Sequence, residues 1–136
     1  MKKLYIILLI LPLIGFGQDL DQILSQERYT INDVNGWFID SVVTKKKDNS
    51  LFTGILVFYQ EDGGISSETQ YFEGKPTGNK RGYHENGRLF YTSIVTNKGR
   101  IINGWYPNGQ ISGITEYKDG VVVLEKCWNE NGKEIE

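Results

Sequence analysis

Hydrophobic and polar residues alternate in short runs along most of the chain, and glycine-containing turns separate these runs. Ile55–Tyr59 and Leu89–Thr92 are typical runs, rich in the β-branched and aromatic residues that suit a pleated strand. The turns recur about every 11 or 12 residues, with glycines at Gly63, Gly74, Gly87, Gly99, Gly109, Gly120 and Gly132. No helical period of useful length follows residue 30, so the pattern predicts an all-β protein.

The turns belong to a longer repeat with a period of 22 to 24 residues. In each of four copies, an aromatic residue precedes a turn glycine by four positions: Tyr59, Tyr83, Trp105 and Trp128. A second register of aromatic residues stands three positions before intervening glycines, at Tyr71 and Tyr117. Asp-Gly and Asn-Gly pairs at the turns favour type I′ hairpins, because both central residues of that turn need positive φ.

A chain of repeated hairpins contacts mainly its neighbours in sequence. Residues 51–136 are therefore predicted to form an elongated, open antiparallel meander, a single-layer twisted sheet with one face that carries the repeated aromatic and aliphatic residues. A compact barrel or sandwich is the alternative, since regularly spaced turns also occur there. The coherent period favours the open sheet.

Residues 18–50 precede the repeats and are predicted to cap the sheet. The pattern indicates a short helix within residues 19–28. Three apolar side chains lie on one side of this helix: Leu20, Ile23 and Leu24. Residues 29–31 and 37–39 flank an Asn/Asp/Gly turn and are expected to pair as an N-terminal hairpin.

Residues 1–17 have the pattern of a secretory signal peptide. Met1–Lys3 is a short basic start, and Leu4–Ile14 is an almost unbroken apolar run, followed by Gly-Phe-Gly directly before Gln18. The run is shorter than the ~20 residues needed to span a bilayer. We expect cleavage between Gly17 and Gln18 and export to the periplasm or the extracellular space; an uncleaved N-terminal anchor is the alternative.

The composition of the chain argues against several classes of function. The length of 136 residues fits one domain, and a single Cys with a single His supplies neither a disulfide framework nor a zinc site, so no metal or cofactor is expected. The net charge of −2 argues against nucleic-acid binding through a basic surface. Residues 18–136 keep 13 of the 15 basic residues and all 17 acidic ones, which gives −4.

Catalytic chemistry finds little support in the sequence. His84 stands at a variable polar position beside a turn, and an exposed turn residue is the favoured interpretation. Glu61, Glu85 and Glu130 recur at matching turn positions, a repeat or more apart, which is too far for paired-carboxylate catalysis. Cys127 is expected to be a small buried hydrophobic residue. The sequence therefore predicts a protein that is not an enzyme and has no catalytic residues.

The repeated aromatic residues are the candidate binding residues. A ladder of aromatic side chains on an open sheet can stack on sugars or pack against another protein. The alternative is that these rings stack on one another as the core of the fold. The six candidates are Tyr59, Tyr83, Trp105, Trp128, Tyr71 and Tyr117.

Several motifs within residues 51–136 match one known repeat. Leu51–Gly54 has the form of an entry motif, Tyr117–Gly120 reads Tyr-Lys-Asp-Gly, and Glu130–Glu134 has the form of a typical ending. This part of the chain resembles the bacterial MORN-variant repeat family, whose members are often labelled YwqK-like antitoxins. The family's Trp position is held here by other residues: Leu56, Lys80, Ile102 and Glu125.

The resemblance implies a MORN-like hairpin sheet that acts as a non-catalytic, antitoxin-like protein-interaction module, with a toxin or an envelope protein as partner. A second hypothesis is a module that binds cell-wall glycan or membrane lipid. Gly104–Tyr106 followed by Asn108 and Gly109 is similar to the aromatic–glycine repeats of cell-wall-binding modules, and MORN repeats elsewhere are associated with membranes.

Overall fold

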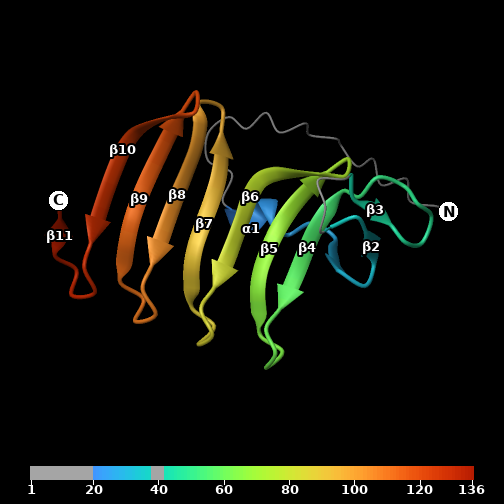
Figure 1. Ribbon diagram of the computed structural model, residues 1–136, viewed down its shortest axis with the longest axis horizontal. Helices are drawn as coiled ribbons and strands as arrows, with labels where there is room; N and C mark the ends of the chain where they lie inside the picture. The colour runs from blue at the N-terminus through green and yellow to red at the C-terminus, as the bar shows by residue number, and fades with distance from the viewer. Residues whose placement is uncertain (1–19, 38–41) are drawn as a thin grey trace.

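The computed structural model describes residues 20–37 and 42–136. Figure 1 shows the strands laid side by side in one long, twisted row that ends at the C-terminus. The expected signal peptide, residues 1–17, lies outside the described residues, so export stays a prediction.

Nine strands form one open sheet in the order β1-β4-β5-β6-β7-β8-β9-β10-β11. Their bounds are β1 Arg28–Thr30, β4 Gly54–Tyr59, β5 Ile65–Phe72, β6 Lys75–Tyr83, β7 Leu89–Thr96, β8 Gly99–Trp105, β9 Ile111–Lys118, β10 Val121–Trp128 and β11 Glu134–Ile135. From β4 onward, each strand is antiparallel to the next one in sequence. The predicted all-β open meander of hairpins is therefore confirmed.

The N-terminal segment joins the sheet in a different way from the one expected. Strand β1 runs parallel to β4, with Tyr29 opposite Leu56, so residues 29–31 do not form one arm of a hairpin. The parallel position lets the Tyr29 ring pack edge-on against Phe52 at a centroid distance of 5.1 Å. Phe38 and Ile39, in the expected second arm, lie outside the described residues.

Two further short elements complete this segment. Strands β2 (Val34–Asn35) and β3 (Thr44–Lys45) pair with each other as a separate two-stranded antiparallel sheet. Helix α1 (Leu20–Ile23) is shorter than predicted because the chain enters β1 at Arg28. The three side chains expected on its inner side are all buried: Leu20, Ile23 and Leu24.

The turns between the strands are not all of one kind. At Glu73-Gly74 and Asp119-Gly120 both residues have positive φ, as the predicted type I′ turn requires. In the longer turns, only the glycine has positive φ. The turn at Gly63 is an example, and it closes with a hydrogen bond from the amide of Gly63 to the carbonyl of Gln60.

In the longer turns, the Asp or Asn side chain accepts a hydrogen bond from the backbone. The Asp62 side chain accepts a hydrogen bond of 2.8 Å from the amide of Gly64, and Asn86 and Asn108 accept equivalent bonds. The prediction of type I′ geometry was therefore wrong for these turns. Asp or Asn is used there because its side chain bonds the backbone two residues further on.

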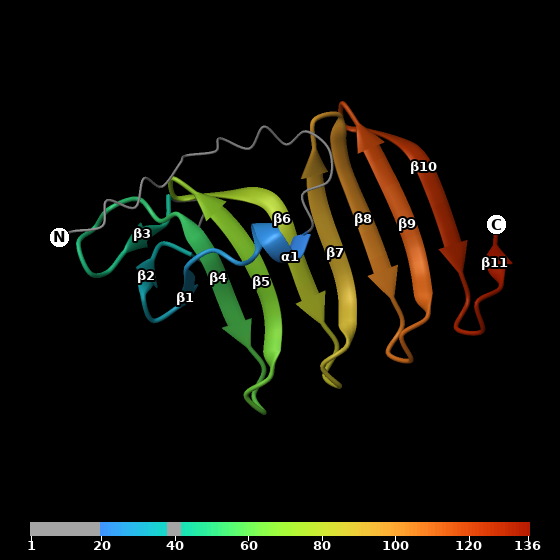
Figure 2. The same cartoon turned by 180° about the vertical axis from the view of Figure 1, so that it is seen from behind.

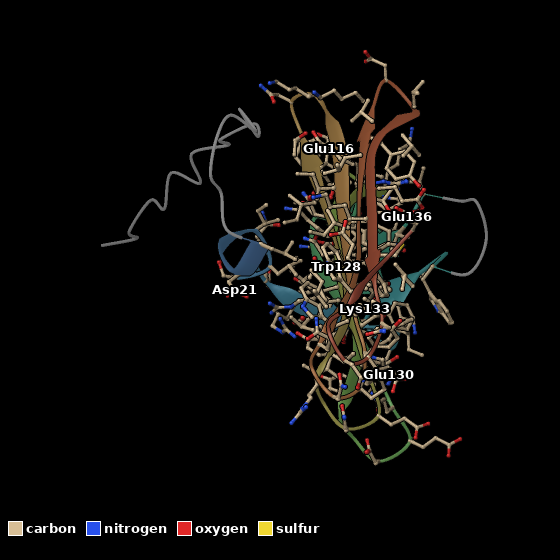
Figure 3. The ribbon with its side chains drawn as sticks, turned by 90° about the vertical axis from the view of Figure 1, so that its left-hand side faces the viewer. Asp21, Glu116, Trp128, Glu130, Lys133 and Glu136 are labelled. Atoms are coloured by element: carbon tan, nitrogen blue, oxygen red, sulfur yellow. The ribbon has the colours of Figure 1, made fainter. Side chains whose placement is uncertain are left out.

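The hydrophobic core lies at the N-terminal end of the sheet, one cluster on each face. On the face that carries α1, Leu20 and Leu24 pack on Ile55 and Val57. On the opposite face, the buried cluster consists of Val34, Val43, Phe52 and Leu56. Figure 3 shows α1 and the β2–β3 segment on opposite sides of the edge-on sheet. The capping segment thus supplies a second layer to both faces, near β4 to β7 on the face that carries α1 and near β4 and β5 on the other.

Candidate binding surface

The two faces of the sheet can be followed strand by strand through the register. Residues directly opposite each other on neighbouring strands share a face, and successive residues alternate between faces. We call the face that carries α1 the helix face and the other the β2 face. One helix-face row crosses six strands through Val57, Glu68, Arg81, Thr92, Asn103 and Ile114.

The six candidate aromatic residues do not form one surface. Four of them belong to the helix face, because each follows a β2-face residue on its strand: Tyr59, Tyr83, Trp105 and Trp128. The other two belong to the β2 face: Tyr71 and Tyr117. The expectation that one face carries all the repeated aromatic residues was therefore wrong. Successive rows of paired residues alternate between the two faces, and an odd number of rows separates the two registers.

The candidates also differ in exposure. Tyr59 is exposed, whereas Tyr83, Trp105 and Trp128 are half-buried. Tyr71 packs against Phe52 with ring centroids 5.5 Å apart, and burial raises the pKa of its phenol. These rings are thus neither a fully exposed stripe nor a closed core.

Tyr83 belongs to a buried ionic cluster. Its hydroxyl donates a hydrogen bond of 2.8 Å to Glu68, whose side chain is only 1% exposed. Arg28 on β1 pairs with the same carboxylate at 2.5 Å, and Arg81 pairs with both Glu68 and Asp21 of α1. The cluster therefore ties β1, α1, β5 and β6 together on the helix face.

The electrostatics of this cluster are those of a satisfied structural network. Burial raises the pKa of the Glu68 carboxyl, but the hydrogen bonds from Arg81, Tyr83 and Arg28 outweigh burial and leave the pKa lowered. Burial and the hydrogen bond to Glu68 raise the pKa of Tyr83 to about 12. With every oxygen engaged by a donor, Glu68 is not placed to act as a general base.

His84 occupies a structural position rather than the exposed position that we expected. Its ring is half-buried, and Nε2 lies 2.8 Å from the carbonyl oxygen of Trp105, one repeat further along the chain. Gln60 donates in the same way to the carbonyl of His84, and the Tyr106 hydroxyl donates to that of Trp128. This ladder joins successive repeats. The sequence held a signal for it, because the three residues stand at the same position of the repeat.

Beyond α1, the helix face carries apolar residues that no described element covers. The aliphatic side chains over β8, β9 and β10 are those of Ile101, Ile114 and Leu124. Next to them lie Trp105, Ile111 and Trp128. Figure 2 shows α1 over the middle of the sheet and β8 to β10 bare on this side. We call these six residues the C-terminal apolar surface; sequence reasoning found its two tryptophans but not its aliphatic residues.

The remaining chemistry of the described residues is sparse. Cys127 is a free, half-buried thiol. Within residues 20–37 and 42–136, no three His, Cys, Asp or Glu side chains are grouped so that they could hold a metal ion. The same part of the chain contains no helix with the length and apolar character of a membrane-spanning segment.

Comparisons with known proteins give no relative for this chain. No protein-family model matches the sequence. No curated protein and no solved structure matches it either.

Proposed function

We propose that this chain is an exported, non-catalytic, MORN-like repeat protein that acts as a protein-interaction module. The observation that carries the proposal is the C-terminal apolar surface. A sheet with an apolar face is stable when that face packs against another layer. Over β4 to β7 the chain provides this layer itself, through Leu20 and Leu24 of α1. Over β8 to β10 a partner supplies it.

The composition of the surface fits a protein partner. Tryptophan is among the residues most often found at the energetic centre of protein interfaces, where aliphatic neighbours exclude water. Trp105 and Trp128 flank Ile111 on adjacent strands, since β9 lies between β8 and β10. An antitoxin-like role, with a toxin or an envelope protein as partner, is the form of this function that the family resemblance implies.

Site-specific photo-crosslinking in intact cells tests the proposal. A photo-reactive residue replaces Ile114 on the helix face, and the matched control carries it at the neighbouring Thr115 on the β2 face. We expect an adduct of defined mass from position 114 and none from position 115. Equal labelling at both positions, or none at either, overturns the proposal.

Glycan binding is the second candidate function, and one observation favours it. Trp105 and Trp128 lie on the same face two strands apart, a separation of about 9.5 Å, which is close to the length of a disaccharide unit in an extended β-1,4-linked chain. Co-sedimentation with purified cell wall tests this role. Pelleting that is lost in a Trp105→Ala/Trp128→Ala variant, and kept in Tyr117→Ala on the β2 face, supports it; absence of pelleting at low salt rejects it.

A further inference from the structure

Three charged side chains belong to the helix face over β9 and β10: Glu116, Lys126 and, at the hairpin end of β9, Lys118. Glu116 lies directly opposite Leu124, and Lys126 lies directly opposite Ile114. The ion pairs of the described residues join Arg28 and Arg81 to Glu68 and Asp21, and neither Glu116 nor Lys126 takes part in one. Glu116 and Lys126 are thus an acid and a base that lie diagonally on adjacent strands and form no ion pair among the described residues.

The acid and the base are placed so that the surface complements itself. Glu116 is on β9, and Lys126 is on β10, two residues away along the strand direction. A two-fold axis parallel to the strands, between β9 and β10, lays β9 of one copy over β10 of the other. Lys126 then lies over the partner copy's Ile114 and beside its Glu116, and the contact occurs twice because the interface is isologous.

The same axis matches the apolar residues and avoids the covered part of the sheet. Trp128 of one copy then lies near Ile111 of the other, since both residues belong to the helix face at the same end of β10 and β9. Helix α1 packs near β4 to β7, on the N-terminal side of β8, so it stays outside the overlap in both copies. Each copy gives the other the second layer that α1 provides elsewhere, as in a packed pair of sheets.

We propose that a second copy of this chain covers the C-terminal apolar surface, face to face, with reciprocal Lys126–Glu116 ion pairs across the interface. The inference rests on the proposed function and names the partner at that surface. Because the β2 face takes no part, the contact buries the helix face of β9 and β10, with β8 beside the short β11 of the other copy, and leaves the β2 face free.

Charge reversal tests the interface. Sedimentation equilibrium measures the dimerisation constant of the protein, as purified from expressing cells, for Glu116→Lys, Lys126→Glu and the double variant. Each single reversal places like charges opposite each other and weakens dimerisation by about tenfold or more. The double reversal restores the opposite charges and returns the constant to near the starting value. Glu125→Lys is the matched control, because Glu125 pairs with Thr115 on the β2 face of the same strand.

The outcomes separate this inference from the proposed function. Dimerisation that falls in both single variants and recovers in the double variant, with Glu125→Lys unchanged, supports the inference. A protein that is monomeric at all concentrations overturns it, and so does a dimer whose dimerisation constant is the same in all the variants. If the protein is monomeric but position 114 still crosslinks to a different protein in cells, the inference fails and the proposed function stands. If neither dimer nor adduct forms, both fail.

Discussion

The Tyr83 hydroxyl donates a hydrogen bond of 2.8 Å to the carboxylate of Glu68. The Glu68 side chain is 1% exposed and lies beneath α1 and β1. The relationship explains why one of the repeated aromatic residues is a tyrosine with a fixed role. Two arginines reach the same carboxylate from β1 and β6, so the buried charge is neutralised on several sides.

Glu68→Gln is expected to destabilise the fold by about 1.5–3 kcal/mol at neutral pH, since hydrogen bonds to a charged group are lost. The folded-state pKa of Glu68 lies below its ordinary value of 4.5. Its stabilising contribution is therefore present above pH 4.5 and is lost as the pH falls through the folded-state pKa. Urea unfolding at pH 7 and pH 3 measures this. A difference between the native protein and the variant that does not shrink at pH 3 contradicts the assignment.

Tyr83→Phe is expected to remove an alkaline transition. Because the folded-state pKa of Tyr83 is raised to about 12 from the ordinary value of 10.0, its contribution is present below pH 10 and is lost as the pH rises toward 12. Ultraviolet titration of the phenolates should show a step near pH 12 that disappears in the variant, while the steps of Tyr29, Tyr71 and Tyr91, whose pKa values are also raised, remain. Tyr59→Phe, an exposed control, should leave that late step in place.

Two turn glycines with nearly the same φ separate backbone strain from close packing. An added Cβ at Gly87 (φ 81°) meets nothing within 4 Å, whereas at Gly74 (φ 82°) it comes within 2.2 Å of Val42 and 2.8 Å of the Val43 carbonyl. Gly87→Ala should cost about 1 kcal/mol for the left-handed conformation alone. Gly74→Ala should cost clearly more. Equal losses in thermal unfolding would show that the β5–β6 turn does not pack on the Val42–Val43 segment.

Truncation of the core should show that the capping segment holds the sheet. Leu24→Ala removes a side chain that is 1% exposed and packs on Ile55 and Val57, with an expected loss of about 2–5 kcal/mol. Val121→Ala, at a site 63% exposed on β10, should change stability by less than about 0.5 kcal/mol. Chemical denaturation compares the two variants. Similar losses in both would mean that the core is not concentrated near α1.

The ladder between repeats should also be measurable. Tyr106→Phe removes the hydrogen bond of 2.9 Å to the Trp128 carbonyl and keeps the ring. The expected loss is about 0.5–1.5 kcal/mol. Hydrogen exchange should locate it at β10 and β11, the last repeat. Faster exchange spread evenly over β4 to β7 would argue against a local link.

The repeat made the strands and their order predictable, because alternation and turn spacing are local properties of the sequence. The pairing of β1 was not predictable, since a parallel neighbour such as β4 is set by a long-range contact between Tyr29 and Phe52. The division of the aromatic residues between faces was missed for a related reason. A bulge beside a turn, such as the one next to Trp105, changes the face on which the following residues of that strand lie. The positions of these bulges depend on backbone geometry.

The most direct test of the account uses two adjacent isoleucines on opposite faces of β8. Ile101 lies on the helix face opposite Glu116, and Ile102 lies on the β2 face opposite Thr115. Methyl-resolved NMR of isoleucine-labelled protein over a dilution series reports on both faces at once. The account predicts that the methyl resonances of Ile101 and Ile114 move with concentration while that of Ile102 stays fixed. Resonances that all stay fixed, or an Ile102 shift as large as that of Ile101, would contradict it.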